Sequence, residues 1–143
     1  MNLRPARSTD AGKVGAILSE FIDTTSWMPR IHTRAEDIGF CAMMIERGWV
    51  TVAVSDGVDG FLAQDGEEVS CLYVSKAAQG NGVGKALLDH AKQRADRLEL
   101  WTFQANDGAR RFYAREGFVE LRETDGARNA ENLPDEFLER RRP

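Results

Sequence analysis

The chain passes from a strand into a helix at residues 74–88, VSKAAQGNGVGKALL, and this passage decides the fold. Apolar residues lead up to Val74, three glycines then alternate, and an amphipathic helix begins at once. Glycine lets a backbone turn tightly and approach a ligand without a Cβ in the way. The amides at the helix start would point at one spot, where the helix dipole also favours an anion. The segment therefore predicts a pyrophosphate cradle made of backbone groups, with a ligand-free tight turn as the alternative.

Two familiar phosphate loops do not fit this spacing. A Walker loop needs Gly-x-x-x-x-Gly-Lys followed by Ser or Thr, whereas Gly84-Lys85 leads into Ala86 and position 79 holds Gln79. A dinucleotide-binding fingerprint needs Gly-x-Gly-x-x-Gly, and Lys85 stands where its last glycine would be. Both motifs are therefore excluded.

Two amphipathic helices are expected before the loop. Apolar residues recur at helical spacing over 14–22 after a short strand at 2–7, and Ser8 or Thr9 is the expected N-cap. Thr33 to Glu36 fits a capping box. The inner face of this second helix would consist of Ile38, Cys41, Ala42 and Ile45.

An antiparallel meander should follow the two helices, and a crossover should follow the loop. Alternating β-formers and Asp-Gly turns predict three strands, at 49–55, 58–64 and 69–74. The rest of the chain reads as helix 80–95, strand 98–103, helix 106–116, strand 118–122 and strand 136–140. Strand–helix–strand implies a parallel crossover within one sheet. We expect a single α/β (α+β) domain over residues 1–143. Its sheet should be mixed and mostly antiparallel, with six to seven strands and about four helices on both faces.

The composition excludes several classes of protein. The 143 residues are 42% hydrophobic and 29% charged, with a net charge of −4, which is ordinary for a globular domain. No basic stripe supports a nucleic-acid partner, and no apolar run supports a signal peptide or membrane span. Cys41 and Cys71 lie in apolar segments, so buried thiols in a reducing cytoplasm are favoured over a disulfide or a metal pair.

A second motif lies at residues 106–118, NDGARRFYAREGF, on the last expected helix. Asn106, Ala109, Arg110 and Tyr113 are spaced i, i+3, i+4 and i+7, and residues at this spacing share one helical face. We expect that face to look back toward the end of the glycine loop.

These two segments resemble the signatures of the GNAT superfamily of acyl-CoA N-acyltransferases. Gln79-x-x-Gly82-x-Gly84 is similar to its (Gln/Arg)-x-x-Gly-x-(Gly/Ala) phosphate loop. The second motif resembles its Asn-x-x-Ala-x-x-(apolar)-Tyr-x-x-x-Gly-Phe pattern. The resemblance is specific over residues 49–118, and Asn81 departs from it, because a basic residue is common there.

The resemblance implies an N-acetyltransferase that uses acetyl-CoA as co-substrate without a metal. Tyr113 would donate a proton to the departing CoA thiolate, and Asn106 would bond the pantetheine arm. Glu68, or an ordered water in its place, would take the proton of the acceptor amine, and strand alternation puts Glu68 on one face with Ser70, Leu72 and Val74. A backbone N–H near Leu72 or Tyr73 would meet the oxyanion. The full set of expected cofactor-binding residues is Leu72, Tyr73, Val74, Gln79, Gly80, Asn81, Gly82, Val83, Gly84, Lys85, Asn106, Ala109 and Arg110.

The acceptor is a small-molecule or peptide amine that no motif identifies. The loops 27–33 and 124–134 are its expected walls, with Trp27, Arg30 and His32 as candidate contacts. A non-catalytic acyl-CoA-binding or regulatory module is the alternative function, and a homodimer is possible.

Overall fold

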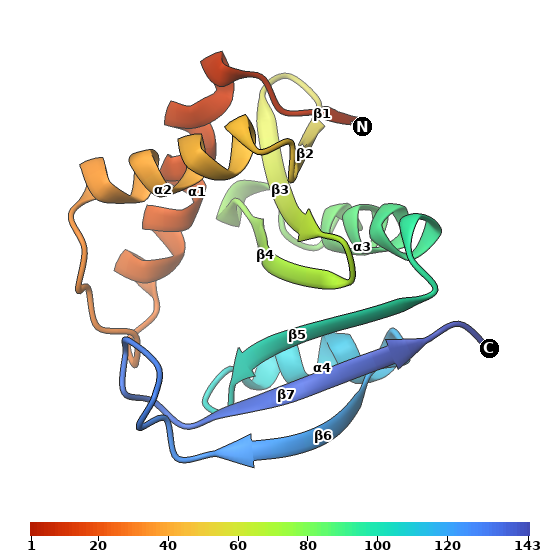
Figure 1. The fold of residues 1–143 in the computed structure, drawn as a ribbon. Coiled ribbons are helices and arrows are strands. Elements are labelled where there is room, and N and C mark those ends of the chain that lie inside the picture. The colour runs from red at the N-terminus through yellow and green to blue at the C-terminus, as the bar shows by residue number, and fades with distance from the viewer.

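The computed structural model describes residues 1–143 and contains one seven-stranded sheet in the order β1-β2-β3-β4-β5-β7-β6 (Figure 1). Only β4 and β5 pair in parallel, and every other neighbouring pair is antiparallel. The strands are β1 (Asn2–Pro5), β2 (Val50–Val54), β3 (Val58–Asp65), β4 (Glu68–Val74), β5 (Arg97–Phe103), β6 (Val119–Thr124) and β7 (Asp135–Arg141). The predicted mixed, mostly antiparallel sheet and its parallel crossover are confirmed.

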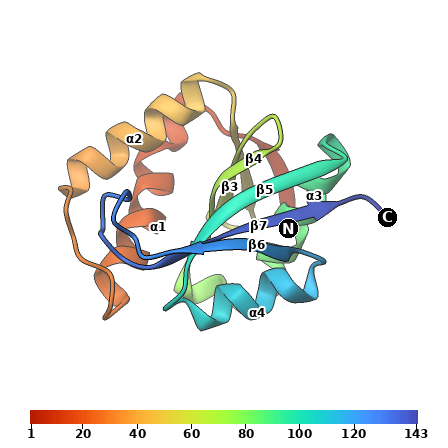
Figure 2. The same cartoon turned by 60° about the horizontal axis from the view of Figure 1, so that its bottom comes forward.

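Four helices cover the sheet from both sides (Figure 2). They are α1 (Ala11–Thr24), α2 (Arg34–Glu46), α3 (Val83–Arg94) and α4 (Asp107–Arg115). Short 3-10 turns at Ser8–Asp10 and Lys76–Ala78 precede α1 and the glycine loop. None of these helices is both long and apolar enough to cross a membrane.

The start of α1 differs from the prediction. Neither Ser8 nor Thr9 caps it; instead the Asp10 carboxylate accepts the Arg7 backbone N–H at 2.7 Å and pairs with Arg4 Nη1 at 2.7 Å. The hydrogen bond from Arg4 is the main reason that the pKa of Asp10 lies below its usual range. Asp10 thus links the end of β1 to the beginning of α1.

The capping box of α2 is confirmed. Thr33 Oγ1 accepts the Glu36 N–H at 3.1 Å, and the Thr33 N–H donates to Glu36 Oε1 at 2.9 Å. The inner face of the helix was predicted wrongly at one position, because Ile38 is 39% exposed while Met44 is fully buried.

Two apolar clusters lie on opposite sides of the sheet. One joins α1 and α2 to β2 and β3, and the other joins α3 and α4 to the remaining face. Cys41 and Cys71 are free thiols in the first cluster, and burial raises the pKa of each to about 12. They are therefore packing groups that stay protonated at neutral pH.

The two helices of the first cluster approach most closely at Gly15. A Cβ built on Gly15 would lie 2.7 Å from Ile38 Cγ1 and 2.8 Å from Ile38 Cα. Real Cβ atoms do not approach backbone so closely, so only glycine allows α1 and α2 to pack at this distance.

Gly15→Ala should therefore destabilise the protein by about 1–3 kcal/mol, the usual cost of overpacking. Gly12→Ala is the matched control, because its added Cβ meets nothing within 4 Å. There the higher helix propensity of alanine should leave stability unchanged or up to about 1 kcal/mol higher. Urea unfolding of both variants measures the difference, and equal effects would contradict the close helix contact.

Candidate active site

The strands β4 and β5 part almost as soon as they meet. Their only paired residues are Glu68 and Glu99, supported by a hydrogen bond of 2.8 Å from the Glu99 N–H to the Glu67 carbonyl. Beyond this point the two strands diverge, as Figure 1 shows. Backbone groups of β4 that point toward β5 then have no strand partner, so this edge can bond a ligand inserted between the strands.

A β-bulge at Ser70 changes which side chains of β4 share a face. Ala63 of β3 lies opposite Cys71, but Gln64 lies opposite Val69, so Ser70 is the extra residue. Cys71 packs with the α1–α2 cluster, whereas Val69 and Leu72 pack with the α3–α4 cluster.

The bulge corrects the predicted alternation around Glu68. The Ser70 hydroxyl donates to Glu68 Oε1 at 3.2 Å, and Ser70 lines the pocket beside α1 and α2. Because a bulge interrupts the two-residue period, Glu68 does not share a face with Leu72 and Val74. Glu68 and Ser70 lie instead on the side of Cys71.

The glycine loop has the backbone conformation that a cradle requires. Gly80 and Gly82 have φ values of +83° and +78°, a backbone conformation that residues other than glycine rarely adopt. A Cβ added at either residue would meet nothing within 4 Å, so the space in front of the loop is open. Gly82 is the N-cap of α3 and has no side chain to accept the first amides of the helix. Those amides are available to an anion.

The side chains around the loop are mostly held by the protein itself. Gln79 Nε2 donates to the Val74 carbonyl at 3.3 Å and so ties the loop back to β4. Lys85 Nζ pairs with Asp89 at 3.0 Å and with Glu116 at 3.4 Å, while Asn81 is exposed. Backbone amides are thus the main donors of the cradle.

A narrow cleft of about 90 Å³ lies between β4 and β5. It is lined by Leu72 and Tyr73 from β4 and by Asn106, Ala109 and Tyr113 from the start and inner face of α4. Asn106 Oδ1 accepts the Ala109 N–H at 3.1 Å and caps the helix. Tyr113 is 8% exposed, and burial raises the pKa of its phenol above the ordinary value. The phenol therefore stays protonated beside the cleft at neutral pH.

Arg110 does not lie with the other predicted cofactor residues. Its Nε pairs with the buried carboxylate of Glu136 at 3.1 Å, and it faces β6 and β7. Phe112 lies nearer the glycine loop, since a Cβ on Gly84 would come within 3.8 Å of its ring. The spacing of residues 106–113 could not reveal this, because the partner of Arg110 comes from β7.

Four aromatic rings bridge the parted strands on the α1 side. Tyr73 of β4 contacts Phe21 with ring centroids 5.0 Å apart, Phe21 contacts Trp27 at 6.2 Å, and Trp27 contacts Phe103 of β5 at 5.8 Å. Trp27 therefore holds β5 in place rather than lining the pocket beside it.

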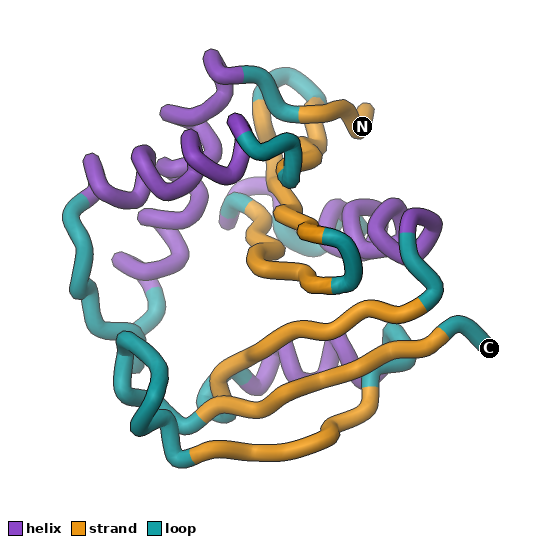
Figure 3. Tube along the Cα trace, in the orientation of Figure 1, coloured by secondary structure: helices purple, strands orange, loops and turns teal.

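That pocket has a volume of about 450 Å³ and is largely apolar. Its walls come from α1, α2, the connection between them and β4, with His32, Ser70 and Tyr73 among its lining residues. The β6–β7 connection runs beside the α1–α2 connection in both ribbon views and closes the pocket with Glu131 (Figures 1 and 2). Both connections are loops without regular structure, as Figure 3 shows.

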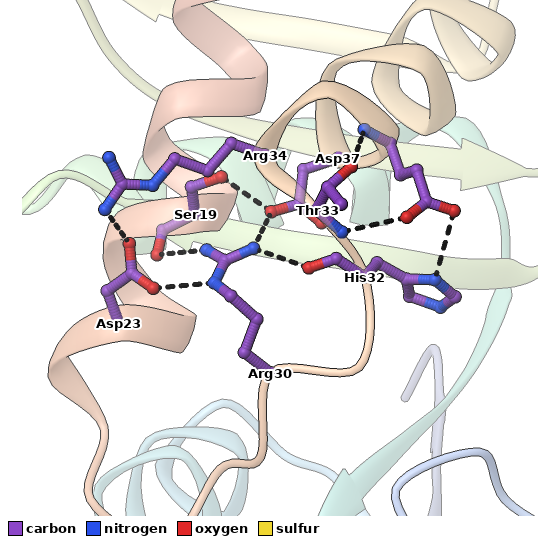
Figure 4. A network of polar contacts seen from close by, with 8 residues as sticks. Ser19, Asp23, Arg30, His32, Thr33, Arg34 and Asp37 are labelled. Atoms are coloured by element: carbon purple, nitrogen blue, oxygen red, sulfur yellow. Dashed lines mark hydrogen bonds and ion pairs between the residues drawn. The ribbon is translucent and has the colours of Figure 1, made fainter.

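A network of charges fixes the α1–α2 wall (Figure 4). Arg30 pairs with Asp23 at 2.7 Å and with the buried carboxylate of Asp37 at 3.0 Å. Asp37 also accepts the Ser19 hydroxyl at 2.6 Å. Arg30 was predicted to contact the acceptor, but its guanidinium is paired with Asp23 and Asp37 and does not line the pocket. His32 does line the pocket.

Glu131 is the pocket residue that sequence reasoning missed. Of the three carboxylates there, Asp37 is bonded to Arg30 and Ser19, and Glu36 caps α2. Glu131 takes part in no ion pair or hydrogen bond, although it lies close enough to Tyr73 to add to the effect of burial in raising the pKa of that phenol. One sequence feature indicated Glu131: it is a carboxylate within the loop 124–134, which was expected to line the acceptor pocket.

Comparison with known proteins gives consistent matches. Residues 30–120 match the family described as Acetyltransferase (GNAT) domain. The peptidyl-lysine N-acetyltransferase YjaB of Salmonella typhimurium is 29% identical over 120 residues, which are 82% of this chain and 83% of that protein. The peptidyl-lysine N-acetyltransferase YiaC of Escherichia coli is 28% identical over 119 residues, covering 78% and 81% of the two chains.

Solved structures share the fold. The solution structure of apo-form YjaB from Escherichia coli has a TM-score of 0.80 at 23% identity, covering 96% of this chain and 95% of that one. The structure of yncA from Salmonella typhimurium with acetyl-CoA has a TM-score of 0.77 at 19% identity, covering 99% and 93%.

Proposed function

The chain belongs to the GNAT acetyltransferase family, and on that premise we propose that it moves the acetyl group of acetyl-CoA to the side-chain amine of a lysine in a peptide. It is an N-acetyltransferase, and acetyl-CoA is its co-substrate. The peptidyl-lysine activity in the names of YjaB and YiaC supports lysine as the acceptor. We place the chain in the cytoplasm as a single catalytic domain, since its free buried thiols suit a reducing compartment.

One juxtaposition carries the proposal. The cleft beside Tyr113 and the larger pocket beside α1 meet at the same stretch of β4, because Cys71 and Tyr73 line both. A thioester entering from the α4 side and an amine entering from the α1 side would therefore face each other across one strand.

The glycine loop fits the pyrophosphate of acetyl-CoA. The space before Gly80 and Gly82 is open, and the uncapped amides of α3 can donate hydrogen bonds to an anion there. Because these donors are backbone groups, they can act on a protein whose net charge is −4. Acetyl-CoA supplies a thioester carbonyl that an uncharged amine can attack directly. The unpaired edge of β4 near Leu72 and Tyr73 would hold the pantetheine arm and the carbonyl oxygen. Asn106, whose Oδ1 is used by the helix cap, would donate from Nδ2.

Two side chains would handle protons. Tyr113 would protonate the departing thiolate, because its phenol lines the cleft and carries its proton at neutral pH before the thiolate leaves. Glu68 would accept the proton of the amine through Ser70 or a water, because the Ser70 hydroxyl connects Glu68 to the acceptor pocket.

Calorimetric titration tests the first half of the proposal. Acetyl-CoA and CoA should bind with micromolar affinity while ATP does not, and Gly82→Glu should weaken acetyl-CoA binding by about 100-fold or more through strain and repulsion. Gly66→Glu is the matched control, because Gly66 also has a positive φ and open space around it but lies in the β3–β4 turn. Equal losses in the two variants would contradict the cradle, and binding without thiol release from any lysine peptide would favour a non-catalytic module.

Tyr113→Phe should lower kcat by about 100-fold and leave the Kd for acetyl-CoA nearly unchanged, since only the proton donor is lost. Packing should survive, because Tyr113 contacts Phe112 and Phe118 through its ring. Steady-state thiol release measures kcat, with Tyr73→Phe as the comparison. Wild-type turnover in Tyr113→Phe together with a large loss in Tyr73→Phe would move the donor to Tyr73.

Glu68→Gln should lower kcat about tenfold near pH 7, with the loss shrinking toward pH 10, where lysine deprotonates without help. Glu67→Gln changes the adjacent exposed carboxylate and should leave the pH–rate profile as in the wild type. Profiles from pH 6 to 10 compare the two variants. A profile for Glu68→Gln that matches the wild type would remove Glu68 from the mechanism.

A further inference from the structure

A second and larger hollow adjoins the acceptor pocket. It has a volume of about 890 Å³ and is lined only by β5, β6, the β6–β7 connection and the first residue of β7. Phe103 and Glu131 line both this hollow and the acceptor pocket, so the two spaces meet at these side chains. An acceptor that extends beyond its reacting amine would therefore continue into the second hollow.

The carboxylates of the second hollow are mostly used to shape its loop. Asp135 is 8% exposed and accepts hydrogen bonds from Thr124 Oγ1 and, at 3.2 Å, from Asn129 Nδ2. Asp125 accepts the Ala127 N–H at 2.9 Å, which closes a turn. Glu131, at the boundary with the acceptor pocket, has no such partner.

The cations of the hollow are free. Arg122 and Arg128 both line it, both are exposed, and neither pairs with a carboxylate. Arg30, Arg97 and Arg110, by contrast, are each paired with a carboxylate. An arginine without a carboxylate partner in a concave site has its full set of donors available to an anion.

Arg122 is also held in place by aromatic rings. Its guanidinium carbon lies 5.2 Å from the ring centroid of Trp101 and 5.1 Å from that of Phe137. Stacking of this kind orients the planar group and leaves its N–H edges free. The hollow thus presents one cation held against aromatic rings, Arg122, and one loop cation, Arg128, and neither lines the acceptor pocket.

We propose that Glu131 binds the ammonium of the acceptor and that Arg122 and Arg128 bind a carboxylate on the same acceptor molecule. Resting on the proposed function, this inference makes the preferred substrate a lysine with an acidic residue beside it in the peptide. The size of the hollow favours a flanking side chain over the α-carboxylate of a free amino acid, and both sources share the same chemistry.

Peptide binding to the CoA-saturated protein tests the inference without requiring turnover. The peptides are capped at both ends and carry one lysine flanked on both sides by glutamate or by glutamine. Calorimetry should show the glutamate peptide binding about tenfold more tightly, the scale of one charge-assisted contact. Arg122→Gln and Arg128→Gln should each reduce that preference to about threefold or less and leave the affinity for the glutamine peptide unchanged. Nα-acetyl-lysine and its amide form a second pair, in which a preference for the acid would assign the carboxylate to a C-terminal source.

Two further variants separate local recognition from the general field of the protein. Arg115→Gln removes an exposed charge from the end of α4, outside the hollow, and should keep the tenfold preference. Glu131→Gln should lower the affinity for both peptides by a similar factor, because it removes the contact with the lysine ammonium that both peptides carry. Equal affinities of the two peptides for the wild type, or equal losses in Arg115→Gln and Arg128→Gln, would overturn the inference. If the wild type prefers the glutamate peptide but transfers no acetyl group to it, the proposed function would be overturned and this inference would stand.

Discussion

The separation of β4 from β5 is the constraint on which the rest of this structure depends. A sheet normally pairs every backbone group along its interior strands, and a buried unpaired group costs about 1–3 kcal/mol. Here the pairing stops after Glu68 and Glu99, in the middle of the sheet. An interior strand edge left open in this way is costly for an isolated fold and useful for a binding protein, because a ligand can supply the missing partners. The cleft, the acceptor pocket and the placement of α4 all follow from this opening.

Packing on both faces keeps the opening from closing. On one face the rings of Tyr73, Phe21, Trp27 and Phe103 connect the two strands through α1 and its loop. On the other face apolar side chains of α3 and α4 pack in the same cluster as Leu72 and Leu100. The bulge at Ser70 belongs to the same arrangement, since it turns Glu68 and Ser70 toward the acceptor side while Leu72 stays on the cofactor side. One extra residue therefore puts Glu68 and Ser70 on the side of Cys71 and leaves Leu72 with the α3–α4 cluster.

Electrostatics in this protein is local rather than global. An overall charge of −4 would repel a polyanion, so the proposed anion site would rely on amides at the start of α3 instead of on lysines. Most charged side chains near the site are neutralised within the fold: Arg30 by Asp37, Arg110 by Glu136, and Lys85 by Asp89 and Glu116. Glu131, Arg122 and Arg128 form no ion pair, and all three line the hollow formed by β5, β6 and the β6–β7 connection.

The sequence by itself determined the parts of this protein that depend on neighbours in the chain. The glycine loop and the capping box at Thr33 are local arrangements, so residue types at short spacings predict them. The alternation of β-formers and the helix between β4 and β5 likewise determined the mixed sheet. Only the tertiary structure decided the bulge at Ser70, the exposure of Ile38, the pairing of Arg110 with Glu136 and the position of Glu131 beside Tyr73. Each of these depends on contacts between segments far apart in the chain, and no local pattern encodes which distant side chain will fill a given space or neutralise a given charge.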